Sequence, residues 1–207
     1  MTIVTRKERE KTEMRQQILN AARHLFLEQG FEKTSIRNIA EQIEYSAGTI
    51  YLYFKDKNEI LFTLHCDSFE ALMAAMQVGL QNEPSAIKRL ELLGKNYLKY
   101  AFENPELYDL MFIMRAPIEV IDCRSDVWRE GQTAFNYLQL VVKDCIEEGY
   151  FPGKDVESIS LMMWSMVHGL ASLKLKNRTM IFEEEKLPTL LEETHQTFIE
   201  IIKTYRK

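Results

Sequence analysis

The sequence predicts an all-α protein. Apolar residues recur at the three- and four-residue spacing of amphipathic helices, and no stretch of the 207 residues alternates long enough to indicate a sheet. Only 8 Gly and 5 Pro occur, and several of them fall between the periodic segments, where helices end. These observations favour about nine helices, arranged as a three-helix N-terminal head and a C-terminal helical bundle.

The N-terminal part predicts a charged arm followed by one amphipathic helix. Residues 1–11 are polar and charged, and we expect them to be frayed. A helix is predicted from about Thr12 to Gln29. Gly30 is expected to end it, with Phe31 folding back as the hydrophobic contact of the cap. The apolar face of this helix consists of Ile18, Ala21, Ala22, Leu25 and Phe26.

Residues 34–57 predict two short helices joined by a tight turn. Ser35 is suited to cap the first helix, and Ser46 the second, which is expected to span about Ala47 to Tyr53. Ile50 and Phe54 should face inward. Two short helices of this kind, the second presenting small and hydroxyl side chains, are typical of a helix-turn-helix that reads a DNA major groove.

The second short helix carries the residues expected to meet DNA bases. Thr49 has a hydroxyl and a methyl group, so it can hydrogen-bond a base edge or contact a thymine methyl. The small residues Ser46, Ala47 and Gly48 allow close approach at the start of the helix. Leu52 is expected to touch a thymine methyl or to make no contact.

The remaining chain predicts one long helix followed by the bundle. Asp56 can cap the long helix, with Glu59 three residues on as in a capping box, and apolar residues continue it to about residue 81. We place the domain boundary at residue 58, with domains 1–58 and 59–207. Further helices are predicted at 86–102, 106–115, 124–148, 155–174 and 188–205, with a loop at 176–186.

Residues 12–62 resemble the helix-turn-helix of the TetR family of bacterial repressors. The residues that carry this resemblance are Gly30-Phe31, Thr34-Ser35, Ile39-Ala40, Ala47-Gly48-Thr49-Ile50-Tyr51, Tyr53-Phe54 and Lys57. In addition, Trp164-Ser-Met-Val-His168-Gly169 is similar to a Trp…His-Gly signature of the ligand domains in that family.

The resemblance implies roles for several of these residues. DNA phosphates are expected to be contacted by Thr34, Ser35, Tyr51, Tyr53 and Lys57, although Tyr51 could instead pack in the core of the head. The long helix after the head is expected to transmit ligand binding to it.

The middle helices are rich in Met and aromatic residues, which can line an adaptable apolar cavity or simply form the core. We expect this region to take a small hydrophobic or aromatic effector and no cofactor. His168 could equally be a core histidine. The candidate lining residues are Tyr108, Met111, Phe112, Trp128, Phe135, Trp164 and His168.

A homodimer is expected because specific DNA sites need an interface of roughly 1,000–2,500 Å², more than one such head buries. The last two helices carry apolar stripes that could form a four-helix interface between two chains, or could pack only within their own chain. The candidate interface residues are Met162, Met166, Leu191, Phe198 and Ile202.

Charge is distributed unevenly. Residues 1–58 hold 10 Lys and Arg against 8 Asp and Glu, whereas the rest of the chain holds 16 against 23 and the net charge is −5. A mildly basic head on an acidic body fits DNA binding at one end, although so small an excess can also arise by chance. The N-terminus lacks an apolar leader and no apolar run reaches 18 residues, so we expect a cytoplasmic protein.

Enzyme chemistry has little support in the sequence. There is no nucleophile elbow, phosphate loop or dinucleotide-binding turn, and the three Cys residues are widely spaced. Glu192-Glu-Thr-His195 has the Glu-x-x-His spacing of a di-iron bundle, but no second copy occurs, and a solvated face is the favoured interpretation.

The sequence therefore predicts a homodimeric, TetR-like transcriptional repressor that is not an enzyme and needs no metal. We expect it to bind a palindromic operator in double-stranded DNA and to be released by a small hydrophobic or aromatic molecule. The alternatives are an activator of the same fold and, much less favoured, a helical enzyme or metal-binding bundle.

Overall fold

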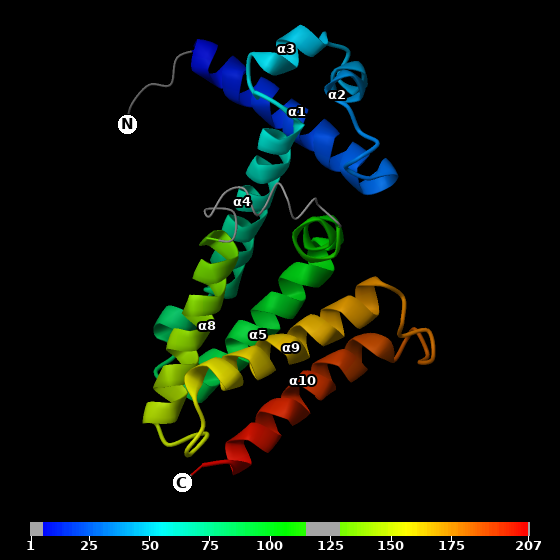
Figure 1. Ribbon diagram of the computed structural model, residues 1–207. Helices are drawn as coiled ribbons and strands as arrows, with labels where there is room; N and C mark the ends of the chain where they lie inside the picture. The colour runs from blue at the N-terminus through cyan, green and yellow to red at the C-terminus, as the bar shows by residue number, and fades with distance from the viewer. Residues whose placement is uncertain (1–5, 115–128, 207) are drawn as a thin grey trace. The chain divides into compact units, whose positions relative to one another are not determined.

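The computed structural model describes residues 6–114 and 129–206 (Figure 1). The chain divides into two compact units: a head unit, residues 1–68 and 106–128, and a body unit, residues 69–105 and 129–207. The described ranges contain nine α-helices and no β-strand, which confirms the all-α prediction. The domain boundary expected at residue 58 stays a prediction.

Helix α1 (Arg6–Gln29) starts earlier than predicted. The expectation of a frayed arm is wrong from Arg6 onward, because Arg6 to Lys11 are good helix formers and Arg6 Nε pairs with Glu10 Oε1 one turn later, at 2.7 Å. The C-terminal end is as predicted. Gly30 has a φ of +88°, and the Phe31 ring lies 5.1 Å from the Phe26 ring.

The two short helices α2 (Ile36–Gln42) and α3 (Ala47–Tyr51) begin at the predicted caps. The Ser35 hydroxyl accepts a hydrogen bond from the Asn38 amide, and Asn38 Oδ1 accepts one from the Ser35 amide in return. The Ser46 hydroxyl accepts one from the Thr49 amide at 3.1 Å. The α2–α3 turn places Glu44 at φ 61°, so a non-glycine residue adopts the left-handed conformation there.

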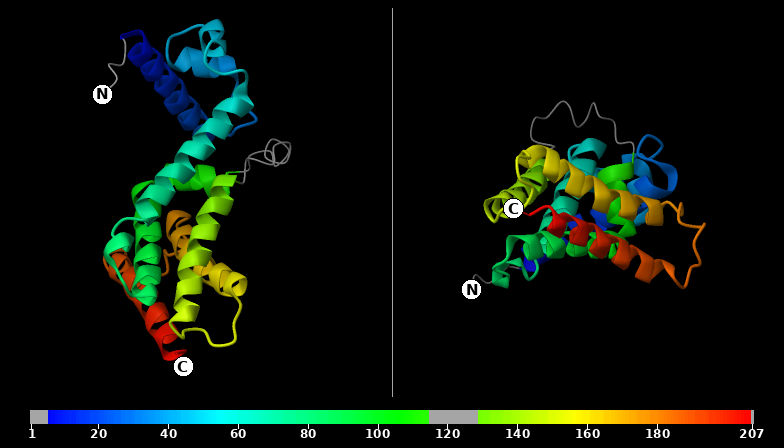
Figure 2. Two further views of the ribbon diagram at one scale, coloured as in Figure 1. Left: turned by 90° about the vertical axis from the view of Figure 1, so that its left-hand side faces the viewer. Right: turned by 90° about the horizontal axis from the view of Figure 1, so that it is seen from below.

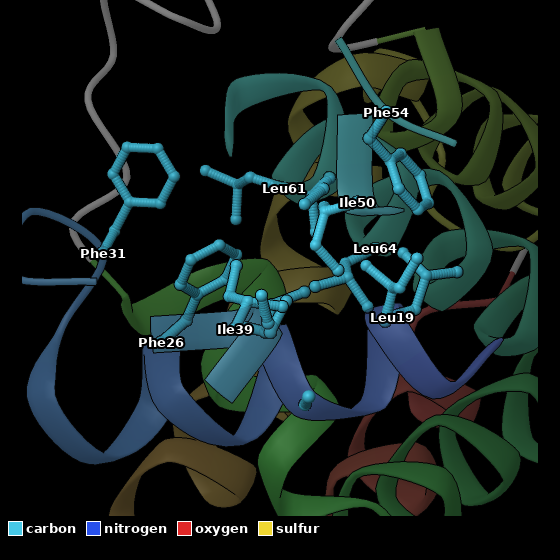
Figure 3. Close-up of a cluster of buried hydrophobic side chains, with 14 residues drawn as sticks. Leu19, Phe26, Phe31, Ile39, Ile50, Phe54, Leu61 and Leu64 are labelled. Atoms are coloured by element: carbon cyan, nitrogen blue, oxygen red, sulfur yellow. The ribbon is translucent and has the colours of Figure 1, made fainter. Parts of the chain in front are cut away.

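A buried apolar cluster joins α1, α2, α3 and the first half of α4 (Lys57–Met76). Figure 3 shows Phe26, Ile39, Ile50, Phe54 and Leu61 among the side chains that fill it. Ile50 and Phe54 are buried as predicted, so the short α3 is held from one side and exposes the other. Leu110, from the π-helical turn η2 (Asp109–Ile113), joins the same cluster.

Helix α4 ends at Met76, about one turn earlier than the sequence indicated. Gly79 has a φ of +79° and starts a 3₁₀ turn, η1 (Leu80–Asn82), instead of continuing the helix. Pro105 then opens α6 (Pro105–Tyr108) at the predicted break, and the helix expected at 106–115 is divided between α6 and η2.

The body unit is built around α5 (Ala86–Glu103), which packs against α8 (Arg129–Glu147), α9 (Val156–Leu175) and α10 (Leu187–Thr204), as Figures 1 and 2 show. The start of α5 is tied to the end of α8: Arg89 Nη2 pairs with Asp144 Oδ2 at 2.6 Å, and the Ala86 amide donates to Glu148 Oε1 at 2.8 Å. The part of the predicted helix at 124–128 lies outside the described residues. Within the described ranges, no helix combines the length and apolarity needed to cross a bilayer.

Helices α5 and α10 are in close contact at Gly94 and His195. His195 is only 2% exposed, and a Cβ atom added at Gly94 would overlap its Nε2 atom. No hydrogen-bond partner reaches the buried Nδ1 atom of His195. Its pKa is lowered by burial, assisted by the nearby charge of Lys95 and opposed by that of Glu91. The neutral ring therefore occupies the space that a side chain at position 94 would need.

Gly94→Ala is expected to lower the free energy of unfolding by about 1–3 kcal/mol, because the added methyl group forces α5 and α10 apart. Gly169→Ala is the control: nothing lies within 4 Å of its added Cβ, so alanine in mid-helix should stabilise by up to about 1 kcal/mol. Denaturant unfolding at one fixed protein concentration measures both. Equal stability of the two variants would contradict the close contact.

Candidate nucleic-acid interface

Helix α3 presents one face to solvent. Tyr51 is 57% exposed and Leu52 is 79% exposed, while Ile50 between Thr49 and Tyr51 is fully buried. Ser46 and Gly48 are also exposed, and Ala47 and Thr49 are partly so. The alternative role for Tyr51, packing in the core of the head, does not fit this exposure.

The first turn of α3 carries a pair of hydroxyl groups. The oxygens of Ser46 and Thr49 lie 3.0 Å apart, and the Ser46 oxygen also accepts from the Thr49 amide. This contact restricts the Thr49 rotamer before any ligand arrives. A side chain held in this way loses less conformational entropy when it forms a hydrogen bond to a base edge.

The side chain of Thr34 has an internal role, which corrects the expectation that it contacts a phosphate. It is 2% exposed, and its hydroxyl oxygen lies 2.9 Å from the Gly30 carbonyl oxygen, to which it donates. The same oxygen accepts from Gln29 Nε2 at 3.4 Å. Thr34 therefore closes the end of α1, whereas its neighbour Ser35 is exposed at the start of α2.

Lys57 also differs from its expected role. Its ammonium group donates to the Phe31 carbonyl oxygen at 2.6 Å and lies 4.1 Å from the centre of the Phe31 ring. This charge-assisted hydrogen bond and cation–π contact join the start of α4 to the turn after α1. Tyr53 is partly buried against the apolar cluster of the head, so only part of its ring is accessible.

Two exposed residues beside α3 were not singled out from the sequence. Tyr45 is exposed in the turn before the helix, and Lys55 is exposed after it. Both are chain neighbours of the predicted contacts. Their proximity in sequence was the only available signal, since neither belongs to a motif.

In the body unit, three of the predicted pocket residues lie together. The Phe135 and Trp164 rings are 6.1 Å apart, and the Trp164 and His168 rings are 5.6 Å apart. Tyr97, which was not among the predicted lining residues, places its hydroxyl 3.0 Å from His168 Nδ1. Burial lowers the pKa of His168, so the imidazole is neutral at physiological pH.

Three other predicted pocket residues belong to the head unit. Tyr108, Met111 and Phe112 lie in the head unit, where Tyr108 and Met111 are buried and the Tyr108 and Phe112 rings are 5.1 Å apart. Trp128 lies outside the described residues. The described pocket residues therefore form two separate groups, Tyr108 with Phe112 in the head unit and Phe135, Trp164 and His168 in the body unit.

Two of the predicted interface residues are buried within their own chain. Leu191 is 6% exposed and Ile202 is 3% exposed, so each packs inside the body unit and the expectation that they face a partner is wrong. Met162 is exposed, and Met166 and Phe198 are partly exposed. The same hairpin of α9, loop and α10 exposes further large apolar side chains, namely Leu161, Leu173, Met180, Ile181, Phe182, Ile201 and Tyr205.

The Glu-x-x-His sequence does not form a metal site in the structure. Glu192 is exposed while His195 is buried, so the two side chains do not share one environment. In the described part of the chain, no group of three His, Cys, Asp or Glu side chains is placed to hold a metal ion.

Comparison with known families and proteins identifies the head and the body separately. A family described as "Bacterial regulatory proteins, tetR family" matches residues 18–64, and one described as "Tetracyclin repressor-like, C-terminal domain" matches residues 90–197.

Individual relatives match part of the chain. The chain is 30% identical over 97 residues to an uncharacterised helix-turn-helix regulator of Haemophilus influenzae, 47% of this chain and 52% of that protein. It is 32% identical over 77 residues, 37% of this chain, to a fatty acid metabolism regulator of Bacillus subtilis. The chain thus spans 52% of the length of the Haemophilus influenzae protein and 40% of the length of the Bacillus subtilis protein.

The fold as a whole is similar to that of solved regulators. The crystal structure of FadR from Bacillus subtilis, determined in complex with stearoyl-CoA, has a TM-score of 0.71 at 20% sequence identity. The comparison covers 90% of this chain and 96% of that one. An identity this low supports the shared fold alone.

Lys57→Met is expected to lower the free energy of unfolding by about 1–2 kcal/mol, because it removes a charge-assisted hydrogen bond and leaves the Phe31 carbonyl without that donor. Lys55→Met is the matched control, since it removes the same charge from an exposed neighbouring position. Denaturant unfolding monitored by circular dichroism compares the two. If both variants are as stable as the wild type, Lys57 is free to act as a phosphate contact instead.

Proposed function

The chain belongs to the TetR family of bacterial transcriptional regulators and carries a DNA-binding helix-turn-helix, and we propose that it acts as a repressor that a small apolar molecule releases from its operator. The operator DNA of a bacterium lies in the cytoplasm, so we propose a cytoplasmic location for the protein.

The observation that carries the proposal is the asymmetry of α3. Its inner side chains, Ile50 and Phe54 just after it, are buried in the head, while Thr49, Tyr51 and Leu52 face outward to different degrees. A rigid helix with hydroxyl, phenol and aliphatic groups outward can meet both base edges and phosphates. We assign base contacts to Ser46, Ala47, Gly48, Thr49 and Leu52.

Phosphate contacts are assigned to the remaining exposed groups. Tyr51 and Tyr53 have phenol hydroxyls that can donate to a phosphate oxygen, and Ser35 stands exposed at the start of α2. Lys57 is bonded to the Phe31 carbonyl and is therefore poorly placed to contact a phosphate. We assign that phosphate contact to Lys55, an exposed cation two residues earlier.

A homodimer on a palindromic operator doubles the area of contact that one head provides. The exposed apolar side chains of α9, α10 and the loop between them support this assembly, because a second copy could cover them and remove them from water. Met162, Met166 and Phe198 remain the proposed contacts from the original set.

The effector proposed is a small hydrophobic or aromatic molecule in the body unit. The cluster of Phe135, Trp164 and His168 supports an apolar ligand with a hydrogen-bonding group, because the neutral imidazole and the Tyr97 hydroxyl supply polarity at one point. The FadR complex makes stearoyl-CoA a reasonable first compound to test. An effector releases DNA only by the difference between its affinities for the two states.

The proposal is tested by selecting duplexes from a random pool with the full-length protein and titrating the enriched sequence against salt. We expect a two-fold symmetric site and a steep loss of affinity with salt. Reporter transcription from a promoter that contains this site then separates repression from activation. Enrichment of no sequence would overturn the proposal, and increased transcription would replace the repressor by an activator.

Thr49→Ala is expected to weaken binding to the selected operator by about 1–3 kcal/mol and to relax base preference at one position of each half-site, because the hydroxyl and methyl contacts are lost together. Thr133→Ala is the control, an exposed threonine of α8 whose hydroxyl donates to the Arg129 carbonyl. Binding to single-base operator variants measures both. A uniform loss on every sequence would show that Thr49 contacts the backbone instead.

A further inference from the structure

The C-terminal end of α4 has backbone carbonyl groups that accept no hydrogen bond from a described backbone amide. A helix end has several such groups, and here the Gln77 and Val78 amides donate to Met73 and Ala75. The Leu80 amide donates to Gln77. The described backbone hydrogen bonds leave the carbonyls of Met76 and Val78 without an amide donor.

A single side chain satisfies both carbonyls. Asn96 Nδ2 donates to the Met76 carbonyl oxygen at 3.1 Å and to the Val78 carbonyl oxygen at 2.9 Å. An amide nitrogen carries two hydrogens, so both donors are used. Because Asn96 lies in the middle of α5, the end of α4 is fixed to the central helix of the body unit by polar contacts with a defined geometry.

The turn that follows is shaped to fit against α5. Gly79 has a φ of +79°, and a Cβ atom at this position would lie 3.3 Å from Leu92 Cδ2. Leu92 is one turn before Asn96 on α5. Glycine at 79 thus allows the chain to turn close to α5, where the amide of Asn96 can reach the two carbonyls.

The neighbour of Asn96 contacts the proposed effector cluster. Tyr97 is buried and its hydroxyl lies 3.0 Å from His168 Nδ1 on α9. Consecutive residues on one turn of α5 therefore bond to two different helices, α4 through Asn96 and α9 through Tyr97. A displacement of this turn as a unit moves both contacts, because the hydrogen-bonded helix holds adjacent residues at a fixed spacing.

We propose that Asn96 is a positioning residue: its two hydrogen bonds fix the C-terminal end of α4 to α5, and the transmission along α4 that the family resemblance implies depends on them. The inference rests on the proposed function, because it needs a head that binds an operator. Two hydrogen bonds from one planar amide restrict the end of α4 in distance and in orientation, which apolar packing alone does less specifically.

Asn96→Asp tests the link with almost no change of shape. The carboxylate has no hydrogen to donate and turns an oxygen towards two carbonyl oxygens, so the contact becomes repulsive. Asn136→Asp is the matched control. It adds the same charge to an exposed site in the body unit, where the side-chain oxygen that accepts from Gln132 Nε2 at 2.7 Å is kept.

Three measurements are made on the full-length wild type and both variants. Hydrogen exchange reports the protection of a peptide that covers residues 73–83, fluorescence anisotropy gives the affinity for the selected operator and for a scrambled duplex, and thermal unfolding gives the midpoint. We expect exchange in this peptide to become at least about tenfold faster in Asn96→Asp. Operator affinity should fall about tenfold while scrambled-DNA affinity stays close to that of Asn136→Asp. The unfolding midpoint should fall by about 2–8 °C relative to Asn136→Asp because two hydrogen bonds are lost, so all affinities are measured well below it.

The outcomes separate the link from the proposed function. Unchanged exchange in Asn96→Asp, or faster exchange with operator affinity equal to that of Asn136→Asp, overturns the positioning role. An equal loss of affinity on operator and scrambled DNA also overturns it, because it indicates a charge effect and not a change in the position of the heads. If the wild type selects no sequence at all, the proposed function fails and the link to DNA binding fails with it, whatever the exchange result.

Discussion

The packing of α5 is the constraint on which the rest of the body unit depends. This helix has eighteen residues and contacts four neighbouring helices, each through a different residue. Arg89 pairs with α8, Gly94 leaves room for a ring of α10, Asn96 holds the end of α4 and Tyr97 reaches α9. Polar and small residues carry these contacts around a core of buried leucines, so the sequence of α5 defines the directions in which the other helices can approach.

In the head, some Thr and Lys side chains are exposed to solvent, whereas others form hydrogen bonds within the unit. Thr49 is partly exposed on α3, whereas the Thr34 hydroxyl forms hydrogen bonds with Gly30 and Gln29 at the C-terminal end of α1. Lys55 is exposed, whereas Lys57 bonds to the chain after α1. The internal groups fix the turn between α1 and α2 and the start of α4. These contacts flank the five-residue helix α3 and hold the segments on either side of it.

How far the sequence predicts this structure depends on the range of the interactions involved. Caps at Ser35, Ser46 and Gly30 were predictable because a cap is decided within four residues. Apolar spacing located most helices for the same reason. The role of Lys57 was not predictable, because it bonds to a carbonyl 26 residues away. The Thr34 contacts are local, but the sequence does not show whether its side chain points towards the end of α1 or towards solvent. An apolar stripe likewise shows that Leu191 and Ile202 are buried, but it does not distinguish their own chain from a partner.

The fit of His195 against Gly94 also limits how the two positions can evolve. An alanine or any larger residue at 94 is obstructed while histidine occupies 195, and a smaller residue at 195 alone leaves a void beside α5. The accessible order of substitution therefore begins at 195 and ends at 94, through an intermediate with a cavity. Among homologues, the two positions should change as a pair, and the spacing between α5 and α10 should vary with the size of that pair.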